Sequence, residues 1–526
     1  MTIKRFILTL LTIFAVGKLL LDLVGSFSQP QVQSRLQLYQ TNLILHASEY
    51  QVDNNRESAQ ENFDFARQAL IGEKAYYSAQ KQYEKSLEVA EKSRENLRRK
   101  LEQQQPTVIN DSTVEVPPLA QPSGENKQNQ QLVKAIAQVD RFIDELQLKI
   151  GIIQARQDRT EEAIATWNQI IESSPDNLAD ATNAQIAEIV KGLWSEIPVV
   201  IPGAEEKIQA NLEGWFRYRA LYKLYEIQGQ SAKLAALESQ EETVAQTAMV
   251  KLTLIGGIPA IAGFLGIILL VSLLAQVALK GKESILATHS GVPWKTPWNW
   301  EITWQVLIVG FFTIGQIILP LLLGLSGFNP TNLGLRAKAI YVLISYLLMA
   351  FAGLLVLFLS IKEFLPLPKS WFRIKPTDNW IFWGIGGYLV AVPLVVIVSL
   401  VNQQIWQGQG GSNPILLLAL EAKDSVVLAI FFITASVAAP VFEEIMFRGF
   451  LLPSLTRYVP VWGAILGSSL IFSIAHLSLS EVLPLTMLGI VLGFVYTRSR
   501  NLLAPMLLHS LWNGGTLLSL FVLGSG

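Results

Sequence analysis

The sequence predicts an all-α polytopic membrane protein that also carries a large water-soluble helical region. Three observations predict this class. Hydrophobic residues make up 51% of the 526 residues, and only 16% are charged. After residue 249 the chain contains eight apolar runs that each approach the ~20 residues needed to cross a bilayer core. Residues 26–248, in contrast, are polar, with long charged stretches typical of exposed helices.

The N-terminus combines a short basic segment with a long apolar run. Phe6–Val24 is apolar apart from Lys18 and Asp22, which are four residues apart and share a helical face. No small-residue cleavage site follows, which favours an uncleaved transmembrane signal anchor over residues 1–25; a cleaved signal peptide is the alternative.

The region 26–248 contains no spanning segment. A Pro-, Gln- and Asn-rich stretch at about 104–130 is typical of a linker. Helices are expected over 131–240, where four residues follow the spacing of a tetratricopeptide (TPR) repeat: Gly151, Ala163, Trp167 and Pro175. An ordinary helical hairpin explains the same pattern. In either case we expect this region to bind a protein partner rather than to perform chemistry.

Residues 249–526 are expected to form an eight-helix membrane bundle. Tryptophans near the run ends are typical of interfacial belts: Trp294, Trp298, Trp300, Trp371 and Trp380. The eight runs are 252–279, 300–325, 338–361, 380–401, 425–447, 461–477, 482–497 and 503–523.

Basic residues predict the orientation of the chain. Lys4 and Arg5 favour a cytoplasmic N-terminus, and alternation of the spans then brings most other Lys and Arg clusters to the same side. Residues 26–248 would lie on the opposite side. The expected location is a cell membrane or a thylakoid-type inner membrane.

Composition excludes several function classes. A net charge of −1 gives no basic surface for nucleic acid. The chain has no cysteine, which excludes disulfides, thiolate metal sites and a cysteine nucleophile. Any metal would have to be bound by His and carboxylate side chains.

Three charged residues stand in an apolar run, within Ala439–Arg448. Charged groups at membrane depth are functional by default. Glu443 and Glu444 are neighbours and point about 100° apart on a helix, whereas Glu444 and Arg448 are four apart and share a face. The simplest division pairs Glu444 with Arg448 and turns Glu443 to the reaction centre. The reverse division and a purely structural ion pair are the alternatives.

Two histidines follow within apolar runs. His476 stands four residues after Phe472, and His509 stands four residues before Asn513, so each pair shares a helical face. Polar contacts between helices would explain either pair alone. The other two histidines, His46 and His289, lie in polar surroundings without a partner pattern.

Taken together, these residues favour activation of a water molecule. Glu443 is the candidate general base. A zinc-like divalent ion bound by Glu443, His476 and His509 would perform the same activation. The residue types leave the metal-dependent and the metal-free glutamate mechanism open.

Three motifs in order on membrane helices resemble the intramembrane CAAX-protease and bacteriocin-processing (CPBP) family, which includes the Ras-converting CAAX endopeptidases. They are Glu443-Glu-x-x-x-Arg448, Phe472-x-x-x-His476 and His509-x-x-x-Asn513. The resemblance covers 425–515 closely, extends to 250–526 by architecture, and does not cover 1–248.

The resemblance implies an eight-helix membrane protease that hydrolyses a peptide bond of a peptide or protein substrate at the bilayer. It implies that Glu443 activates water with help from His476. His509 and Asn513 would stabilise the oxyanion or help to bind a metal. Glu444 and Arg448 would support the site.

The depths of these residues disagree. Counted from the basic side at helical rise, Glu443 lies ~8 Å deep, His509 ~14 Å and His476 ~21 Å. For them to meet, the helix before His476 must start deeper, tilt, or border a re-entrant segment, which is tolerated only where it is buried in protein or lines a water-filled cavity.

Two further functions compete with an endopeptidase. A non-catalytic scaffold or chaperone would recruit partners through 26–248, but it has no physical need for charges in hydrocarbon. A transporter with a carboxylate proton relay lacks the paired inverted-repeat signals of that class.

Overall fold

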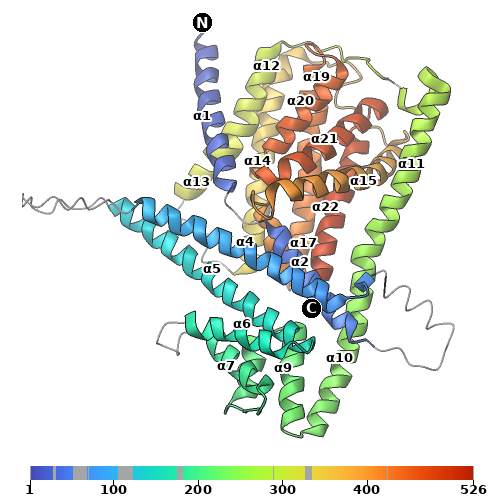
Figure 1. Ribbon diagram of the computed structural model, residues 1–526. Coiled ribbons are helices and arrows are strands. Elements are labelled where there is room, and N and C mark those ends of the chain that lie inside the picture. Colours follow the sequence, from blue (N-terminus) through green and yellow to red (C-terminus); the bar gives the residue numbers. More distant parts are fainter. Residues whose placement is uncertain are drawn as a thin grey trace, which may run out of the picture. The chain divides into compact units, whose positions relative to one another are not determined.

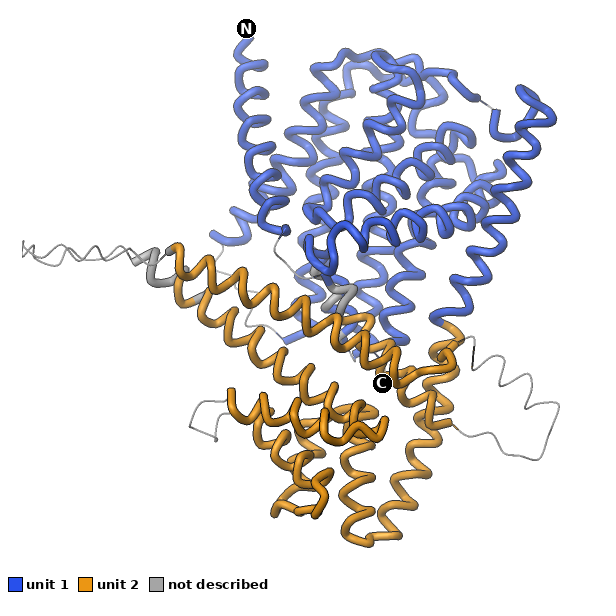
Figure 2. Tube along the Cα trace, viewed as in Figure 1, with its two compact units in different colours: residues 1–32, 255–525 blue, residues 33–254, 526 orange. Residues whose placement is uncertain are grey.

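The computed structural model describes residues 2–27, 31–50, 68, 70–104, 123–173, 182–287, 289–325, 334–422 and 424–524. Over these residues the chain is helical without an extended strand (Figure 1). The predicted all-α polytopic membrane class is confirmed. The chain divides into two compact units, which are described separately (Figure 2). Unit 1 comprises Met1–Val32 and Ile255–Ser525, and unit 2 comprises Gln33–Leu254.

Among the described residues, eight helical runs are long and apolar enough to cross a membrane. They are Ile3–Ser26, Ser231–Glu283, Trp300–Leu325, Leu335–Phe364, Trp380–Trp406, Ser425–Leu455, Leu479–Ser499 and Leu503–Gly524. The N-terminal run is one of the eight, so seven follow it where the sequence predicted eight.

The missing eighth span is the segment predicted at 461–477. It forms helix α20, Val461–Ile474, of 14 residues. At helical rise this is about 21 Å, shorter than the ~30 Å hydrocarbon core. The prediction of a full span here is therefore wrong, because the helix ends before the polar residues that follow it.

The helices of unit 1 are α1 (Ile3–Ser26), α11 (Ile258–Lys280), α12 (Trp300–Gln305), α13 (Leu319–Leu325), α14 (Leu335–Ile361), α15 (Trp380–Trp406), α16 (Pro414–Glu421), α17 (Ser425–Ile433), α18 (Ala439–Glu444), α19 (Leu452–Leu455), α20, α21 (Leu479–Ser499) and α22 (Leu503–Gly524). Wider π-helical turns interrupt three of the candidate spans in the described residues. They are η1 (Thr253–Gly257), η4 (Val306–Ile318), η7 (Thr434–Ala438) and η8 (Ile445–Leu451). Insertions of this kind occur often at functional sites.

Three of the five predicted belt tryptophans are buried instead. Trp294, Trp298 and Trp371 are each no more than 5% exposed. Trp298 packs edge-to-face on Trp371 at 4.3 Å and donates its indole N–H to Ser454 Oγ at 2.9 Å. These rings therefore fill the core at one end of the bundle. Trp300 keeps the exposure expected of an interfacial residue.

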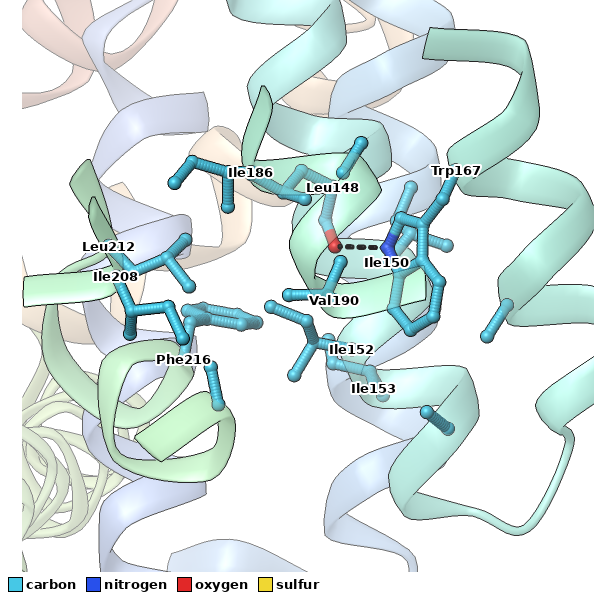
Figure 3. Packing of buried hydrophobic residues seen from close by; sticks show 14 of the residues in the cluster. Leu148, Ile150, Ile152, Ile153, Trp167, Ile186, Val190, Ile208, Leu212 and Phe216 are labelled. Carbon is cyan, nitrogen blue, oxygen red and sulfur yellow. Dashed lines mark hydrogen bonds between the residues drawn. The ribbon is translucent and has the colours of Figure 1, made fainter. Parts of the chain in front are cut away.

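Unit 2 consists of amphipathic helices of the kind found in water-soluble domains. They are α2 (Val32–Ser48), α4 (Ala75–Gln104), α5 (Ser123–Arg156), α6 (Thr160–Ser173), α7 (Thr182–Trp194), α8 (Ala204–Asn211), α9 (Gly214–Ile227) and α10 (Ser231–Leu252). Their inward faces form one core, part of which is shown in Figure 3.

The helices α5 and α6 form the hairpin expected around Gly151. A Cβ at Gly151 would lie 2.2 Å from Trp167 Nε1, so only glycine permits this close crossing. The same indole donates to the Leu148 carbonyl at 3.2 Å (Figure 3). Pro175 lies outside the described residues, and assignment as a TPR stays a prediction.

The predicted linker at 104–130 lies mostly outside the described residues. Helix α5 begins at Ser123, so the last part of that stretch is helical.

Candidate active site

The two glutamates lie on α18 between the π-helical segments η7 and η8. Pro440 opens this short helix at a position where its missing N–H costs little. The side chain of Glu444 is fully buried, whereas that of Glu443 is 16% exposed. The neighbours therefore point in different directions, as the helical geometry requires.

Glu444 is the centre of a buried ionic chain. Arg448 Nη1 donates to Glu444 Oε1 at 2.8 Å, and both side chains are 0% exposed. His509 Nδ1 lies 2.8 Å from the same oxygen. A carboxylate oxygen that accepts a hydrogen bond from Arg448 can only accept from His509 as well. The donor in the second contact is therefore Nδ1 of the imidazole, which carries the proton. The structure thus contains the expected Glu444–Arg448 pair and adds His509 to it.

Arg448 makes two further contacts that hold it in place. Its Nη2 donates to the Gly489 carbonyl on α21 at 3.2 Å, and its guanidinium lies over the Phe472 ring at 4.5 Å. A buried ion pair survives only when such additional partners compensate for lost hydration.

Glu443 faces the other nitrogen of the same histidine. His509 Nε2 lies 3.9 Å from Glu443 Oε2, too far for a direct hydrogen bond. The second carboxylate oxygen accepts the Tyr346 hydroxyl of α14 at 3.1 Å. Glu443 is thus held at one oxygen and open at the other.

Phe472 connects the two histidines. Its buried ring packs edge-to-face on His476 at 5.0 Å and on His509 at 5.7 Å. Both imidazoles therefore flank one aromatic ring. His476 Nδ1 is engaged with the Phe472 carbonyl at 2.9 Å, which leaves Nε2 as its free nitrogen.

His476 is not inside a helix, contrary to the prediction. Helix α20 ends at Ile474, and His476 lies in the turn before α21 begins at Leu479. His476 nevertheless lies near His509, because both imidazole rings pack against the ring of Phe472.

Asn513 holds the last helix against a π-helical turn. Its Nδ2 donates to the Ala435 carbonyl of η7 at 2.8 Å. One N–H of the amide is therefore committed to the backbone.

The predicted metal ligands do not form a three-ligand site. Nowhere in the described ranges do three His, Asp or Glu side chains gather closely enough to hold a metal ion. Glu443 and His509 face each other, but no third such side chain completes the set in the described part of the chain. The arrangement of these residues therefore does not fit the predicted three-ligand site.

Comparison with known proteins finds a match over the stretch that contains these site residues. Residues 425–515 match the model of the type II CAAX prenyl endopeptidase Rce1-like family. Over these residues the chain is similar to that family. The match includes all six predicted site residues and α17 to α21.

Two curated proteins are similar to the chain over about two fifths of its length. A putative membrane peptidase, YdiL of Bacillus subtilis, is 28% identical over 218 residues, which is 41% of this chain and 85% of the relative. The membrane-embedded CAAX protease MroQ of Staphylococcus aureus is 27% identical over 220 residues, 40% of this chain and 87% of the relative. No solved structure matches the chain.

Within residues 425–515 and the helices that pack on them, sequence reasoning missed two contributors. Tyr346 lies outside the matched residues, on a helix that pattern analysis treats as simple membrane span. A hydroxyl in such a helix needs an internal partner, which was the available signal. Phe472 was noted only for its spacing, and its role as the shared aromatic neighbour depends on tertiary contacts.

Proposed function

We propose that the region similar to the Rce1-like family is an intramembrane endopeptidase in which Glu443 activates the attacking water. One observation carries this proposal. A partly exposed carboxylate, Glu443, faces Nε2 of the buried His509 across 3.9 Å. If a single water were hydrogen-bonded at ~2.8 Å to both Glu443 Oε2 and His509 Nε2, the angle between these two bonds at the water oxygen would be about 90°.

This geometry orients the water as a nucleophile. Glu443 Oε2 and His509 Nε2 both accept, so they take the two hydrogens of the water and leave an oxygen lone pair for the scissile carbonyl. As the C–O bond forms, Glu443 takes the proton and then delivers it to the leaving amine when the C–N bond breaks. Tyr346 fixes the carboxylate by donating to its other oxygen.

The remaining residues act on charge and position. His476 donates its Nδ1–H to the Phe472 carbonyl, so its Nε2 donates to the oxygen that becomes negative in the tetrahedral intermediate when the imidazole is in its protonated form. Glu444 and Arg448 keep His509 in the tautomer that accepts from water. In this assignment His509 holds the water and His476 serves the oxyanion, which exchanges the roles implied by the family resemblance.

Cleavage by purified full-length protein tests the proposal. The substrates are fluorogenic membrane peptides with and without a prenylated C-terminal cysteine. We expect Glu443→Gln, His476→Ala and His509→Ala each to abolish measurable turnover. His289→Ala is the matched control, because His289 is exposed and contacts only the Arg498 carbonyl among the described residues. Parental turnover in Glu443→Gln would overturn the proposal.

The same assay decides the role of metal. A mechanism based on Glu443 and water predicts unchanged turnover after extensive treatment with chelator. Loss of turnover that returns on adding zinc would replace it with the metal mechanism.

We also propose that the N-terminus is cytoplasmic and that unit 2 lies on the opposite side, where it recruits a protein partner. The support is the distribution of basic residues in the sequence. Because the chain has no cysteine, Ser239→Cys adds a single exposed thiol to unit 2. Labelling by an impermeant maleimide from the extracytoplasmic side is expected, and labelling only from the cytoplasmic side would contradict the orientation.

A further inference from the structure

The N-terminal helix α1 packs along unit 1 over most of its length. At its start, Lys4 and Arg5 both pair with Glu301, at 3.3 and 2.9 Å. About one turn further along α12, Trp304 donates its indole N–H to Thr12 Oγ1 at 2.8 Å. These polar contacts fix the rotation of α1 about its axis.

The middle of α1 reaches the helix that precedes His476. Ala15 is buried with Ile308 and Phe312 of η4, and Ile471 and Ala475 pack against the same cluster. A small cavity beside it is lined by the ion pair of Lys18 and Asp22, by Gln316, and by Leu477, the residue after His476. The charged pair noted in the sequence thus lies next to the turn that carries His476.

That turn adopts a backbone conformation that needs support. Leu477 has φ of 58°, in the left-handed region that residues other than glycine seldom occupy. Such a residue persists only where its surroundings determine it, and it is found most often at functional sites.

A glycine-rich loop supplies part of the support. Gly410 accepts from the backbone N–H of Ser480 at 3.1 Å and from the Ser478 hydroxyl at 3.2 Å. Asn402 donates to the Ser480 carbonyl at 2.7 Å, and the N–H of Asn413 donates to Glu481 at 2.9 Å. The start of α21 is therefore tied to residues 402–413.

The end of α1 supplies the rest. Ser26, only 3% exposed, accepts the backbone N–H of Leu479 at 3.2 Å. Gln31 donates its backbone N–H to the Gly408 carbonyl at 2.8 Å and its side-chain amide to the Gln409 carbonyl at 2.5 Å. One segment therefore contacts both the His476 turn and the loop that supports it.

We propose that α1 is a positioning helix of the peptidase, and that Ser26 and Gln31 hold His476 at the reaction centre. This inference rests on the proposed function and deepens it. It requires that α1 stay attached in the mature protein as part of the catalytic unit, although it lies far outside the residues that match the Rce1-like family. Ser26 and Gln31 touch no substrate and act through the turn.

Kinetics of the full-length protein provide the first test. Ser26→Ala and Gln31→Ala are each expected to lower kcat at least about tenfold with KM within about twofold, because a small misplacement of a reacting group is costly. Ser26→Thr keeps the hydroxyl and should restore most of kcat. Ser272→Ala is the matched control, since its hydroxyl bonds only to the Ile268 carbonyl of its own helix.

A second readout needs no substrate. Leu477→Cys places a single thiol beside His476 in a chain without cysteine. Its alkylation by N-ethylmaleimide is expected to be faster when Ser26→Ala is also present, and unchanged when Ser272→Ala is present. Intact mass of the purified protein should show that residues 1–25 are retained.

The outcomes separate the two proposals. If the parent cleaves no peptide but alkylation accelerates with Ser26→Ala, the positioning helix stands and the peptidase assignment fails. If the parent cleaves and neither kcat nor alkylation changes, the positioning helix is overturned while the peptidase assignment stands. A mass that lacks α1 also overturns it.

Discussion

Each unit of the molecule contains a buried histidine–glutamate pair, and the two pairs differ in what lies beyond them. In unit 1, His509 Nδ1 lies 2.8 Å from Glu444, and the other ring nitrogen faces the partly exposed Glu443. In unit 2, His46 Nδ1 lies 2.6 Å from Glu241, and in the described part of the chain His46 has no other acidic partner. The contact is the same, but only the first pair leads to an accessible carboxylate.

The difference shows what converts a buried pair into a reactive one. Glu241 bonds to His46 within the core of the helical unit 2, and this contact serves to satisfy two buried polar groups. Glu444 is itself fully buried, yet it fixes the tautomer of a histidine that another acid can use. Burial and pairing alone are therefore poor indicators of function, and a second, accessible carboxylate facing the other ring nitrogen is the better one.

Exchanging the two histidines for alanine gives the largest expected contrast. His509→Ala should lower peptide cleavage by at least about a hundredfold, because the water loses one of its two acceptors. His46→Ala should leave cleavage within about twofold of the parent. Equal losses in both variants, measured on folded protein with a fluorogenic peptide, would remove the functional distinction between the pairs.

Breaking the ionic chain should give the largest loss of stability. Arg448→Met leaves Glu444 buried with one fewer donor, which is expected to cost about 3–5 kcal/mol. Adding Glu444→Gln to the same chain should recover part of that loss, since no net charge then stays buried. Thermal unfolding of the purified protein in detergent measures both, and a double variant less stable than Arg448→Met would contradict this account.

Close helix packing in unit 1 gives an intermediate effect. A Cβ at Gly266 of α11 would lie 1.9 Å from the Leu389 carbonyl of α15. Gly266→Ala must therefore separate the two helices and is expected to cost about 1–3 kcal/mol. Gly256→Ala is the control, because nothing lies within 4 Å of its Cβ position. Similar thermal midpoints for the two variants would argue against the close crossing.

A pH-dependent effect in unit 2 is the smallest. Burial, with a contribution from nearby Asp140, raises the pKa of Asp144 on α5 to about 6 from its ordinary 3.8. The stability that this group contributes is complete below about pH 4 and is lost as the pH rises through 6. Asp144→Asn should therefore protect α4 and α5 relative to the parent at pH 8 but not at pH 4.

The expected gain from Asp144→Asn is roughly 1 kcal/mol or less, because solvent screens a side chain that is only half-buried. Amide hydrogen exchange of the full-length protein resolves the two helices. A gain that is constant from pH 4 to pH 8 would show that the carboxylate is not the cause.

The sequence predicted the helical class and most spans because long apolar runs have few other solutions in a membrane. It also predicted the Glu444–Arg448 pair, since four-residue spacing on a helix is local information. It could not predict that α20 ends at Ile474, because the apolar run continues to the polar turn without a break in composition. The sequence also could not predict that His46 is paired, because its partner Glu241 is 195 residues away along the chain.

The shortness of α20 also concerns the lipid around the protein. Trp462, Leu466 and Leu470 form an exposed stripe on this helix, at four-residue spacing. A helix about 21 Å long cannot match a hydrocarbon layer of ~30 Å, so the bilayer beside this stripe must become thinner. Headgroups and water would then approach the turn that holds His476 from the side. The enzyme would consequently sense bilayer thickness, working fastest in short-chain lipids and slowing as the acyl chains lengthen.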